Sequence, residues 1–346
     1  MKKIGINGLG RIGRLVLKHY IENPSEDVKI VAANDLTSIE DLIYLLKYDS
    51  VYGISPYIIE NEQDKIRIQP IKEKGSTVEL EDVNIKFFQE KKPENIPWEN
   101  LDVDIVLECT GLFRRREDAA KHLDAGASKV IISAPSKSAD ITIVQGVNHE
   151  KYEKQTHHII SNASCTTNSL APAVKVLNDV FKVKHLLVTT IHAYTASQNL
   201  VDGDSRKRRR GRAAAINLVP TSSGAAKATE LVLPELKGKM DAMAVRVPVI
   251  DGAITDIVAE LEKDVTVDTI NEAFKEASDT NLKGILKYSE EDLVSSDIIG
   301  DGHSGIVDAK STRVIDDNMV KILVWYDNEA GYAKKILELA EYISTK

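Results

Sequence analysis

A glycine-rich turn near the start of the chain lies between a short apolar run and an amphipathic segment, and this arrangement restricts the fold more than any other feature. Residues 3–7 have the composition of a short buried strand, and apolar residues recur at helical spacing over residues 12–20. The turn between them carries the spacing GxGxxG, with Gly8, Gly10 and Gly13. In this context the spacing predicts a dinucleotide site, because glycine lets backbone N–H groups at a helix N-terminus approach a pyrophosphate.

An acidic residue follows where such a turn requires one. Residues 28–34 form a second β-rich run, and Asp35 comes directly after it. A carboxylate at this point accepts hydrogen bonds from a ribose 2′-hydroxyl and repels a 2′-phosphate, which favours NAD over NADP. The alternative is a structural glycine turn beside a solvated aspartate. Because the strand, the helix and the acidic residue occur together, we expect a dinucleotide site.

Strand-like and helical segments alternate through the first half of the chain. Short apolar runs with the β-branched bias of buried strands are followed or preceded by helical patterns. The runs cover residues 104–109, 130–133 and 141–144, and the helical patterns cover residues 39–46 and 116–126. This alternation indicates βαβ units and an α/β fold with a parallel sheet between two layers of helices.

The second half has longer strand candidates in which apolar and polar residues alternate, after a helical pattern over residues 165–181. Alternation with one polar face predicts an antiparallel or mixed sheet. We expect an α+β domain whose sheet is mixed and largely antiparallel. The candidates cover residues 186–192, 243–249, 254–261 and 319–325. We expect the domain boundary just before Cys165, which gives domains 1–164 and 165–328. The amphipathic segment 331–344 ends the chain, and its pattern leaves open which domain it packs on.

Size, charge and cysteine content limit the classes of protein and partner. A chain of 346 residues suggests two domains, and the net charge of −8 disfavours nucleic acid or an anionic membrane as the main partner. Two cysteines cannot form a disulfide framework, which fits a reducing compartment. The apolar runs are too short for a signal-peptide core or a membrane span. We therefore expect a cytoplasmic protein.

Small hydrogen-bonding residues surround one cysteine at the predicted start of the helix over residues 165–181. Ser164 precedes Cys165, and Thr166 follows it. A helix N-terminus favours the thiolate, and a fall in thiol pKa from about 8.5 to about 6 raises the thiolate fraction at pH 7 from roughly 3% to roughly 90%. The nearby hydroxyls and N–H groups can hold an oxyanion or a phosphate. The alternative is a buried structural cysteine, which is our interpretation of Cys109 at the end of an apolar strand.

A histidine, His192, ends the strand candidate over residues 186–192. A loop at this strand end can aim the imidazole at Cys165, and a Cys–His pair is the usual means of making a thiolate and moving its proton. General acid–base help of this kind contributes about 10²–10⁴-fold. The alternative is a strand-end histidine whose ring nitrogens make structural hydrogen bonds.

Positive charge is concentrated in the run over residues 206–212, which contains Arg210. The run can bind nucleic acid, bind phosphate or form a solvated loop, and the acidic chain as a whole makes a phosphorylated metabolite the better ligand. Ser223 and Gly224 belong to a hydroxyl-rich turn at the start of a further predicted helix, which resembles an anion site. Arg246 interrupts an apolar strand and needs a counter-ion, for which a substrate phosphate is a candidate.

Five sequence blocks resemble the glyceraldehyde-3-phosphate dehydrogenase family in order and spacing: NGLGRIGR, SNASCTTN, TTIHAYT, RVPV and WYDNEAGY. The resemblance covers nearly the whole chain. It implies a Rossmann dinucleotide-binding domain, a catalytic domain with a mixed sheet, and a C-terminal helix over residues 329–346 that returns to the first domain. It also implies a homotetramer, NAD as cofactor, no metal, and glyceraldehyde 3-phosphate and inorganic phosphate as substrates.

The resemblance further implies a reaction of glycolysis and gluconeogenesis. Cys165 attacks the aldehyde carbon of glyceraldehyde 3-phosphate while His192 activates the thiol and takes the proton of the hemithioacetal. Oxidation by NAD leaves a thioester, which inorganic phosphate cleaves to give 1,3-bisphosphoglycerate.

Residue by residue, the family pattern assigns cofactor and phosphate sites. The positions matching the cofactor site are Gly8, Gly10, Arg11, Ile12, Gly13, Asp35, Thr110, Gly111, Ser133, Asn328 and Tyr332. Those matching the site of the attacking phosphate are Ser164, Thr166, Arg210, Ser223 and Gly224. Those matching the site of the substrate phosphate are Thr195, Ser197 and Arg246.

Two departures and two alternatives stay open at this point. Gly203 and Asp204 replace a Leu-Pro pair common in bacterial members, which weakens the steric case against NADP, and the run over residues 206–209 is unusually basic. Erythrose-4-phosphate dehydrogenase shares the same blocks but hydrolyses its acyl-enzyme. The other alternative is a binding protein that keeps the fold and holds RNA through the basic loop. Because Cys165, His192, Asp35 and Arg246 are all present, we expect an active enzyme rather than the binding protein. Of the two dehydrogenases we expect the phosphorylating one, and a requirement of turnover for inorganic phosphate distinguishes them.

Overall fold

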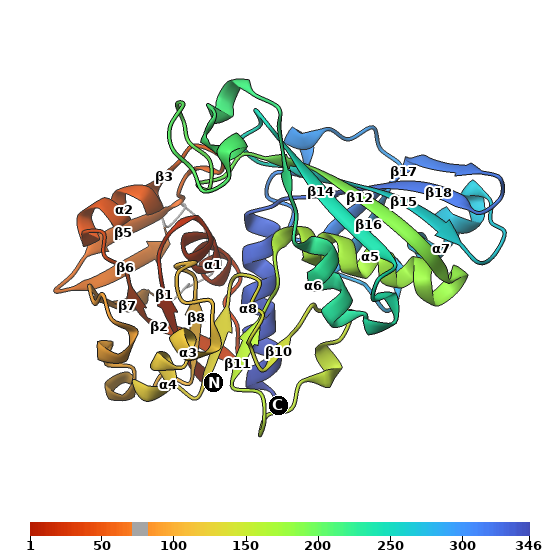
Figure 1. The fold of residues 1–346 in the computed structure, drawn as a ribbon. Coiled ribbons are helices and arrows are strands. Elements are labelled where there is room, and N and C mark those ends of the chain that lie inside the picture. The colour runs from red at the N-terminus through yellow and green to blue at the C-terminus, as the bar shows by residue number, and fades with distance from the viewer. Residues whose placement is uncertain (71–81) are drawn as a thin grey trace, which may run out of the picture. The chain divides into compact units, whose positions relative to one another are not determined.

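The computed structural model describes residues 1–70 and 82–346, which divide into two compact units (Figure 1). The first unit comprises Met1–Thr142, Tyr152–Asn162 and Ala333–Lys346, and the second comprises Ile143–Lys151 and Ala163–Tyr332. Segment 143–151 therefore belongs to the second unit, although it precedes the predicted boundary. The reason is packing, since Val144 and Val147 are buried in the core of the second unit.

The first unit is built on a sheet that has nine strands within the described residues. Its order is β10-β11-β9-β8-β1-β2-β7-β6-β5, with parallel pairing from β10 to β7 and antiparallel pairing at β5 and β6. The bounds are β1 Lys2–Asn7, β2 Val28–Asn34, β5 Tyr57–Asn61, β6 Lys65–Pro70, β7 Val83–Phe88, β8 Ile105–Glu108, β9 Lys129–Ile132, β10 Ile141–Thr142 and β11 Ile159–Ser161.

This strand order confirms the predicted α/β fold. The first strand, β1, lies between β2 and β8, so the chain leaves it on one side and returns on the other. That reversal is the topological switch point of the Rossmann fold, where dinucleotides bind at the carboxyl ends of the strands. The strand centres are fully buried, as a sheet covered on both faces requires: Ile4, Ile30, Val106 and Ile131 are each 0% exposed.

The helices of the first unit follow the predicted pattern with one difference. The expected helix over residues 116–126 is two four-residue helices, and the chain then turns at Gly126 with φ +105°. The helices are α1 Arg11–Glu22, α2 Ile39–Lys47, α3 Arg116–Ala119, α4 Lys121–Asp124 and α8 Ala330–Ser344, whose residues from Ala333 belong to this unit. Two 3₁₀ turns, Pro93–Asn95 and Glu99–Leu101, and the hairpin of β3 Tyr48–Asp49 and β4 Gly53–Ile54 complete it.

The second unit is built on a mixed sheet of seven strands in the described part of the chain. Four of its six strand pairs are antiparallel, which confirms the predicted α+β class. In the order β13-β14-β12-β15-β18-β17-β16, the bounds are β13 Val219–Ser222, β14 Met240–Val247, β12 Val183–Ala193, β15 Ala253–Leu261, β18 Met319–Tyr326, β17 Gly305–Ile315 and β16 Leu286–Ser289. The sequence pattern does not predict β13, β16 or β17.

Three helices gather on one face of this sheet (Figure 1): α5 Cys165–Phe181, α6 Ala225–Val232 and α7 Val267–Asp279. Leu170, Val174 and Leu177 of α5 form a buried core with Ile257 of β15 and Val324 of β18. Short 3₁₀ turns cover His149–Lys151, Arg208–Gly211, Ala214–Ile216, Pro234–Leu236 and Ser295–Ile298. This packing places the first residue of α5 near the carboxyl end of β12.

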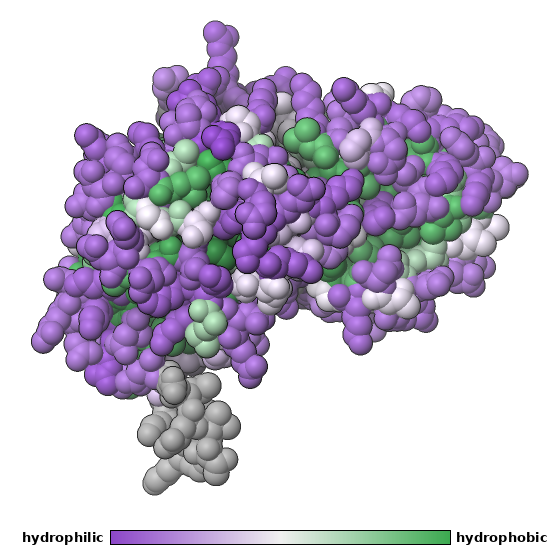
Figure 2. Space-filling view, turned by 90° about the horizontal axis from the view of Figure 1, so that it is seen from below, coloured by the Kyte–Doolittle hydropathy of each residue, from purple (hydrophilic) through white to green (hydrophobic). Residues whose placement is uncertain are grey.

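The largely hydrophilic surface and the absence of long apolar helices from the described residues agree with the composition of the chain. Figure 2 shows hydrophilic side chains over most of the visible face, with smaller exposed apolar areas. No helix in the described ranges is both long and apolar enough to cross a membrane. Nor do residues 1–70 and 82–346 bring three or more histidine, cysteine, aspartate or glutamate side chains together in a metal-binding cluster.

Candidate active site

Cys165 is the first residue of α5, and a strained turn presents it. Ala163 adopts a left-handed conformation with φ +55°, which is uncommon for a residue other than glycine. Tyr332 supports this turn, since its hydroxyl donates to the Ala163 carbonyl at 3.0 Å. Ser164 then caps the helix, because its Oγ accepts from the Thr167 N–H at 3.1 Å. The turn and the cap together fix the direction of the cysteine side chain.

The structure brings Cys165 and His192 together, with Sγ 3.5 Å from Nε2. His192 lies near the carboxyl end of β12 and is buried. Its other nitrogen, Nδ1, is 2.7 Å from the Ala193 carbonyl oxygen. When Nδ1 donates to this carbonyl, Nε2 carries a lone pair and faces the thiol as a proton acceptor.

Arg246 lies opposite His192 because β12 and β14 pair in parallel with these two residues in register. One guanidinium nitrogen is 2.9 Å from Nδ1 of His192 and donates to the Ala193 carbonyl at 2.8 Å. A second nitrogen, Nε, is buried and has no hydrogen-bond partner among the described residues. A buried cation with an unused donor suits an anionic ligand.

Burial controls the charge of the pair. It raises the pKa of the Cys165 thiol, and the positive charge of Arg246 and a hydrogen bond from Thr166 oppose that rise only in part. It also lowers the pKa of His192 to about 3, and Arg246 adds to this lowering. The expectation that the thiol pKa is lowered at this helix N-terminus is therefore wrong, because desolvation outweighs the charge of Arg246 and the hydrogen bonds at the helix start. At neutral pH the pair is a thiol beside a neutral imidazole.

Tyr326 is a member of the site that the sequence analysis does not identify. Its buried hydroxyl lies 2.9 Å from the Thr166 hydroxyl and 2.8 Å from the Thr190 hydroxyl. Its ring meets that of His192 edge to face, with centroids 5.9 Å apart. Burial raises its pKa, so it stays a neutral hydrogen-bonding group. The sequence around Tyr326 does not indicate this role, because the position of Tyr326 beside His192 depends on β18 lying two strands from β12 in the sheet.

Four of the predicted phosphate-site residues form one hydrogen-bonded group. Arg246 donates to Thr195 Oγ1 at 3.4 Å, which lies 2.9 Å from Ser197 Oγ. Arg210 donates to that serine hydroxyl at 3.1 Å and, through Nε, to the Thr221 hydroxyl at 3.1 Å. Two guanidinium groups and several hydroxyls therefore converge, which is a donor set suited to phosphate.

The remaining predicted phosphate residues lie at two helix starts. Ser164 and Thr166 flank Cys165 at the start of α5. Gly224 precedes the first residue of α6, and Ser223 Oγ accepts from the Ala225 N–H at 3.2 Å. No hydrogen bond in the described part of the chain joins Ser223 or Gly224 to the group around Arg246.

The glycine turn of the first unit has the shape that a pyrophosphate needs. A Cβ on Gly8, which has φ +95°, would lie 2.7 Å from the Thr110 nitrogen, and a Cβ on Gly13 would lie 2.0 Å from the Gly8 oxygen. These two glycines are therefore required by packing. A Cβ on Gly10 would meet no atom within 4 Å, so the space above this residue is open. Helix α1 begins there with Gly10 as its cap and no side-chain capping bond, so the positive end of the helix dipole lies beside this open space.

A pocket of about 560 Å³ adjoins this turn. Asp35 lies in its wall, where one carboxylate oxygen accepts from the Leu9 N–H at 2.7 Å and the other from the Thr37 N–H at 2.9 Å. These bonds fix the carboxylate and leave lone pairs for a ribose hydroxyl. The pocket is lined by Asn7, Gly8, Gly10, Asn34, Asp35, Leu36, Glu90, Lys91, Lys92, Pro93, Cys109, Thr110, Leu112, Phe113 and Lys121. Its size and position at the switch point fit the adenosine half of NAD.

The other residues of the first unit that are predicted to bind the cofactor lie at strand ends and at the start of α1. Gly111 turns the chain after β8 with φ +72°, and the Ser133 N–H donates to the Glu108 carbonyl at the neighbouring strand end. The guanidinium of Arg11 is engaged by Asp49 at 2.5 Å. The groups that Arg11 and Ile12 contribute at the helix start are therefore their backbone N–H groups.

Asn328, in the second unit, has a buried side-chain oxygen for which the described residues provide no hydrogen-bond donor. Asp327 fixes the backbone beside it, because its Oδ1 accepts from the Glu329 and Ala330 N–H groups at 2.8 and 2.7 Å. A carboxamide N–H is a donor that Oδ1 of Asn328 can accept, which fits the amide of nicotinamide.

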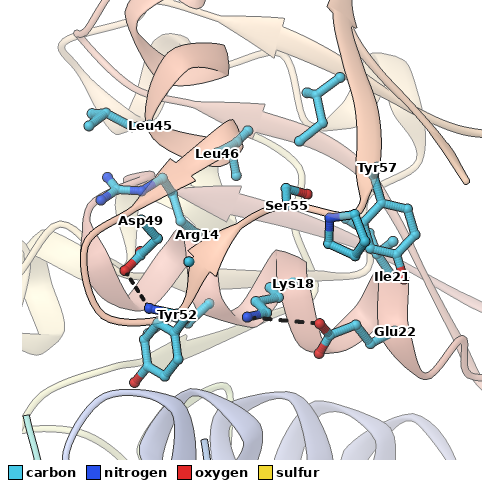
Figure 3. Close-up of a pocket in the computed structure, with 14 residues that line it drawn as sticks. Arg14, Lys18, Ile21, Glu22, Leu45, Leu46, Asp49, Tyr52, Ser55 and Tyr57 are labelled. Carbon is cyan, nitrogen blue, oxygen red and sulfur yellow. Dashed lines mark hydrogen bonds and ion pairs between the residues drawn. The ribbon is translucent and has the colours of Figure 1, made fainter. Parts of the chain in front are cut away.

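A further cavity in the first unit is a poor candidate for a ligand site (Figure 3). It lies among α1, α2 and the strands that follow them, and it has a volume of about 50 Å³, too small for a nucleotide. Its charged groups interact within its own wall. Lys18 lies 3.9 Å from Glu22, and Asp49 accepts from the Tyr52 N–H at 3.1 Å.

Known proteins resemble this chain over its whole length. Residues 2–116 match the sequence model of the glyceraldehyde 3-phosphate dehydrogenase NAD binding domain, and residues 164–328 match that of the C-terminal domain. A glyceraldehyde-3-phosphate dehydrogenase of Geobacillus stearothermophilus is 52% identical over 99% of this chain and 98% of its own. Proteins of the same name from Priestia megaterium and Mycobacterium avium are 51% and 50% identical, each over 99% of this chain and 98% of their own. The chain therefore belongs to the glyceraldehyde-3-phosphate dehydrogenase family.

Proposed function

We propose that this protein is an NAD-dependent phosphorylating glyceraldehyde-3-phosphate dehydrogenase, which oxidises glyceraldehyde 3-phosphate to 1,3-bisphosphoglycerate in glycolysis and gluconeogenesis. The observation that carries the proposal is the 3.5 Å approach of Cys165 Sγ to His192 Nε2, beside a guanidinium with an unused donor. A nucleophile, a proton acceptor and an anion site within one unit suit the oxidation of a phosphorylated aldehyde.

Substrate binding depends on the convergent hydroxyl and guanidinium groups. Arg246, Thr195 and Ser197 hold the phosphate of the substrate, so that its aldehyde carbon lies at Sγ of Cys165. The attacking inorganic phosphate is held by a second set, namely Ser164, Thr166, Arg210, Ser223 and Gly224. Arg210, a member of this second set, also lies beside the first set, because it already donates to Ser197.

His192 moves the proton at Nε2. It takes the thiol proton as Sγ attacks the aldehyde carbon, returns it to the oxyanion, and then takes the hydroxyl proton of the resulting hemithioacetal. When bound, NAD supplies the two-electron acceptor that converts this hemithioacetal into a thioester. Inorganic phosphate, as HPO4²⁻, then attacks the acyl carbon and the carbon–sulfur bond breaks. The proton held by His192 passes to the Cys165 sulfur, and the proton of the attacking phosphate is released to solvent. The acyl phosphate leaves, and the neutral pair is restored.

The residues that hold NAD are those that the family pattern assigns to the cofactor. Gly8, Gly10 and Gly13 form the pyrophosphate turn with the N–H groups of Arg11 and Ile12. Asp35 binds the adenosine ribose and disfavours a 2′-phosphate. Thr110, Gly111 and Ser133 line the cofactor along the strand ends, while Asn328 orients the nicotinamide amide and Tyr332 packs near its ring.

The family resemblance supports two further parts of the proposal. The protein acts as a homotetramer in the cytoplasm. Small phosphorylated molecules are its ligands, and neither a membrane nor nucleic acid is its main partner, in keeping with the net charge of −8.

The proposal is tested by following NADH absorbance with glyceraldehyde 3-phosphate and NAD, with and without inorganic phosphate. We expect turnover that requires phosphate, and no turnover by Cys165→Ala, although this variant should still bind NAD. Turnover without phosphate, or turnover only with erythrose 4-phosphate, would assign the protein to erythrose-4-phosphate dehydrogenase instead. Silence with both sugars would reject both dehydrogenase assignments and reopen the non-enzymatic alternative, which a steep salt dependence of RNA binding would then support.

A further inference from the structure

A buried carboxylate, Glu108, lies at the carboxyl end of β8 and is 1% exposed. Its neighbour His122 is 0% exposed, with Nε2 3.1 Å from Glu108 Oε2. The indole of Trp98 can only donate, and it donates to His122 Nδ1 at 3.0 Å. Nδ1 is therefore an acceptor, Nε2 carries the ring proton, and that proton is directed at Glu108. The contacts thus determine the tautomer of the histidine.

Four donors face the two oxygens of this carboxylate. Oε2 accepts from His122 and from the side-chain amide of Asn7 at 2.6 Å. Oε1 accepts from the backbone N–H of Thr110 at 2.8 Å and from the hydroxyl of the same residue. A carboxylate is the side chain that can accept on both sides in this way, whereas a carboxamide of the same shape must direct an N–H at one pair of donors.

Two of the three partners of Glu108, Asn7 and Thr110, lead to the wall of the cofactor pocket. Asn7 accepts from the Asn34 side chain at 2.8 Å, and Asn34 holds the Glu90 backbone through two hydrogen bonds of 2.9 and 2.7 Å. On the other side, the Thr110 hydroxyl accepts from the Leu112 N–H at 3.0 Å. Asn7, Asn34, Glu90, Thr110 and Leu112 all line the 560 Å³ pocket beside the glycine turn. Glu108 lies behind this wall and joins its two sides.

We propose that Glu108 is a positioning residue of the dinucleotide site, which holds the ends of β1 and β8 at the separation that the adenosine half of NAD requires. The inference rests on the proposed use of NAD. Glu108 acts through Asn7 and Thr110, and His122, whose own position Trp98 fixes, supplies the fourth donor.

The test is the isosteric variant Glu108→Gln. Its carboxamide nitrogen faces either the Asn7 and His122 donors or the two Thr110 donors, so one side of the network is left unpaired. We expect the Kd of NAD and of ADP-ribose, measured by calorimetry, to rise about tenfold while kcat at saturating NAD changes less than about threefold. ADP-ribose lacks nicotinamide, so its affinity reports on this half of the site without turnover.

The matched control is Asp140→Asn. Asp140 lies in the same unit, accepts from the His158 and Ile159 N–H groups at 2.8 Å each, and is absent from the residues that line the pocket. The Asp140→Asn variant should lower the melting temperature and leave the Kd of ADP-ribose within twofold of its value in the unaltered protein. Equal losses of affinity in both variants would mean that Glu108 contributes only to general stability, and the proposal would fail.

A second variant tests the direction of the hydrogen bonds and covers failure of the first to fold. In the double variant Asn7→Asp/Glu108→Gln the donor and acceptor exchange places, so the new amide at position 108 donates to the new carboxylate at position 7. That carboxylate also lies within reach of His122 Nε2, which is 3.4 Å from the Asn7 side-chain nitrogen in the unaltered protein. We expect the Kd of ADP-ribose to return to within about threefold of the original value.

Two further results would overturn the proposal: a folded double variant that does not bind ADP-ribose, and unchanged affinity in Glu108→Gln. Failure of the unaltered protein to bind NAD would instead reject the proposed function.

Discussion

Arg246 touches both the proton acceptor of the site and the carbonyl that orients it. It lies 2.9 Å from Nδ1 of His192 and donates to the Ala193 carbonyl at 2.8 Å. A guanidinium is always charged, so its approach disfavours a second proton on the imidazole. Burial acts in the same direction, and together they hold the pKa of His192 at about 3. The histidine is therefore available as a base, rather than as a permanent cation, when the substrate arrives.

Replacing His192 by asparagine tests this role directly. The variant keeps a hydrogen-bonding side chain but removes the group that accepts the thiol proton 3.5 Å away. We expect the rate of NADH formation to fall by about 10²–10⁴-fold with little change in NAD affinity. Steady-state kinetics at saturating substrates measures the loss. A change of less than threefold would remove His192 from the mechanism.

The same variant makes a prediction about stability and pH. The folded protein binds a proton on His192 only near pH 3, whereas the unfolded chain binds it below about 6.5. Unfolding therefore takes up a proton between these values, and stability is lost as the pH falls from about 6.5 towards 3. Between pH 8 and pH 5, His192 alone lowers the free energy of unfolding by about 2 kcal/mol. Over the same pH range, the His192→Asn variant should therefore lose about 2 kcal/mol less of its free energy of unfolding than the unaltered protein.

Denaturant unfolding at pH 8 and pH 5 measures the difference. His185→Asn is the control, because it exchanges the same residue types at an exposed position of the same strand. An acid-induced loss of stability that is equal in His192→Asn and the unaltered protein would contradict the lowered pKa of His192.

At the scale of the element, two glycines in the turn between β1 and α1 allow the effects of packing and of ligand binding to be tested separately. Gly13→Ala introduces a Cβ 2.0 Å from the Gly8 oxygen, so the start of α1 must shift. It should destabilise the protein by about 1–3 kcal/mol and weaken NAD binding. Gly10→Ala adds a methyl group to open space, so it should cost less than about 1 kcal/mol while still obstructing the pyrophosphate. Melting curves and NAD calorimetry on both variants distinguish the two effects, and equal destabilisation would contradict the difference in packing.

The elements also show what the sequence can predict. The order β1, α1, β2 and the start of α5 follow from glycine spacing and helical periodicity, which are local signals. Strand β17 lacks a clean alternation, because its pairing with β18 is interrupted between Asp308 and Arg313. The contacts of Tyr326 with Thr166 and Thr190, and those of Glu108 with Asn7 and His122, join residues more than ten positions apart, and no periodicity reports such pairings. Burial likewise sets the pKa of Cys165 in a way that its position at a helix N-terminus does not reveal.

At the scale of the whole molecule, the net charge opposes the proposed substrates. A protein with a charge of −8 repels a doubly charged sugar phosphate, yet its most basic segment contains the phosphate-site residue Arg210. Lys207, Arg208 and Arg209 line an open groove of about 500 Å³ with Thr221 and Ser222. Locally positive surface on an acidic protein raises the concentration of anions where it is needed. The role of this loop would then be to accelerate encounter.

Charge reversal in the loop tests such steering. Arg206→Glu with Arg208→Glu changes the charge by 2 × −2, from −8 to −12, at exposed positions. We expect kcat/KM for glyceraldehyde 3-phosphate to fall several-fold at low salt with kcat unchanged, because only the encounter is slowed. The loss should shrink as ionic strength approaches 1 M, where the Debye length is about 3 Å. Lys237→Glu with Lys283→Glu makes the same change in net charge at exposed positions elsewhere in the second unit. An equal loss in this control would assign the effect to net charge, and a loss that persists at high salt would mean that the loop contacts the substrate directly.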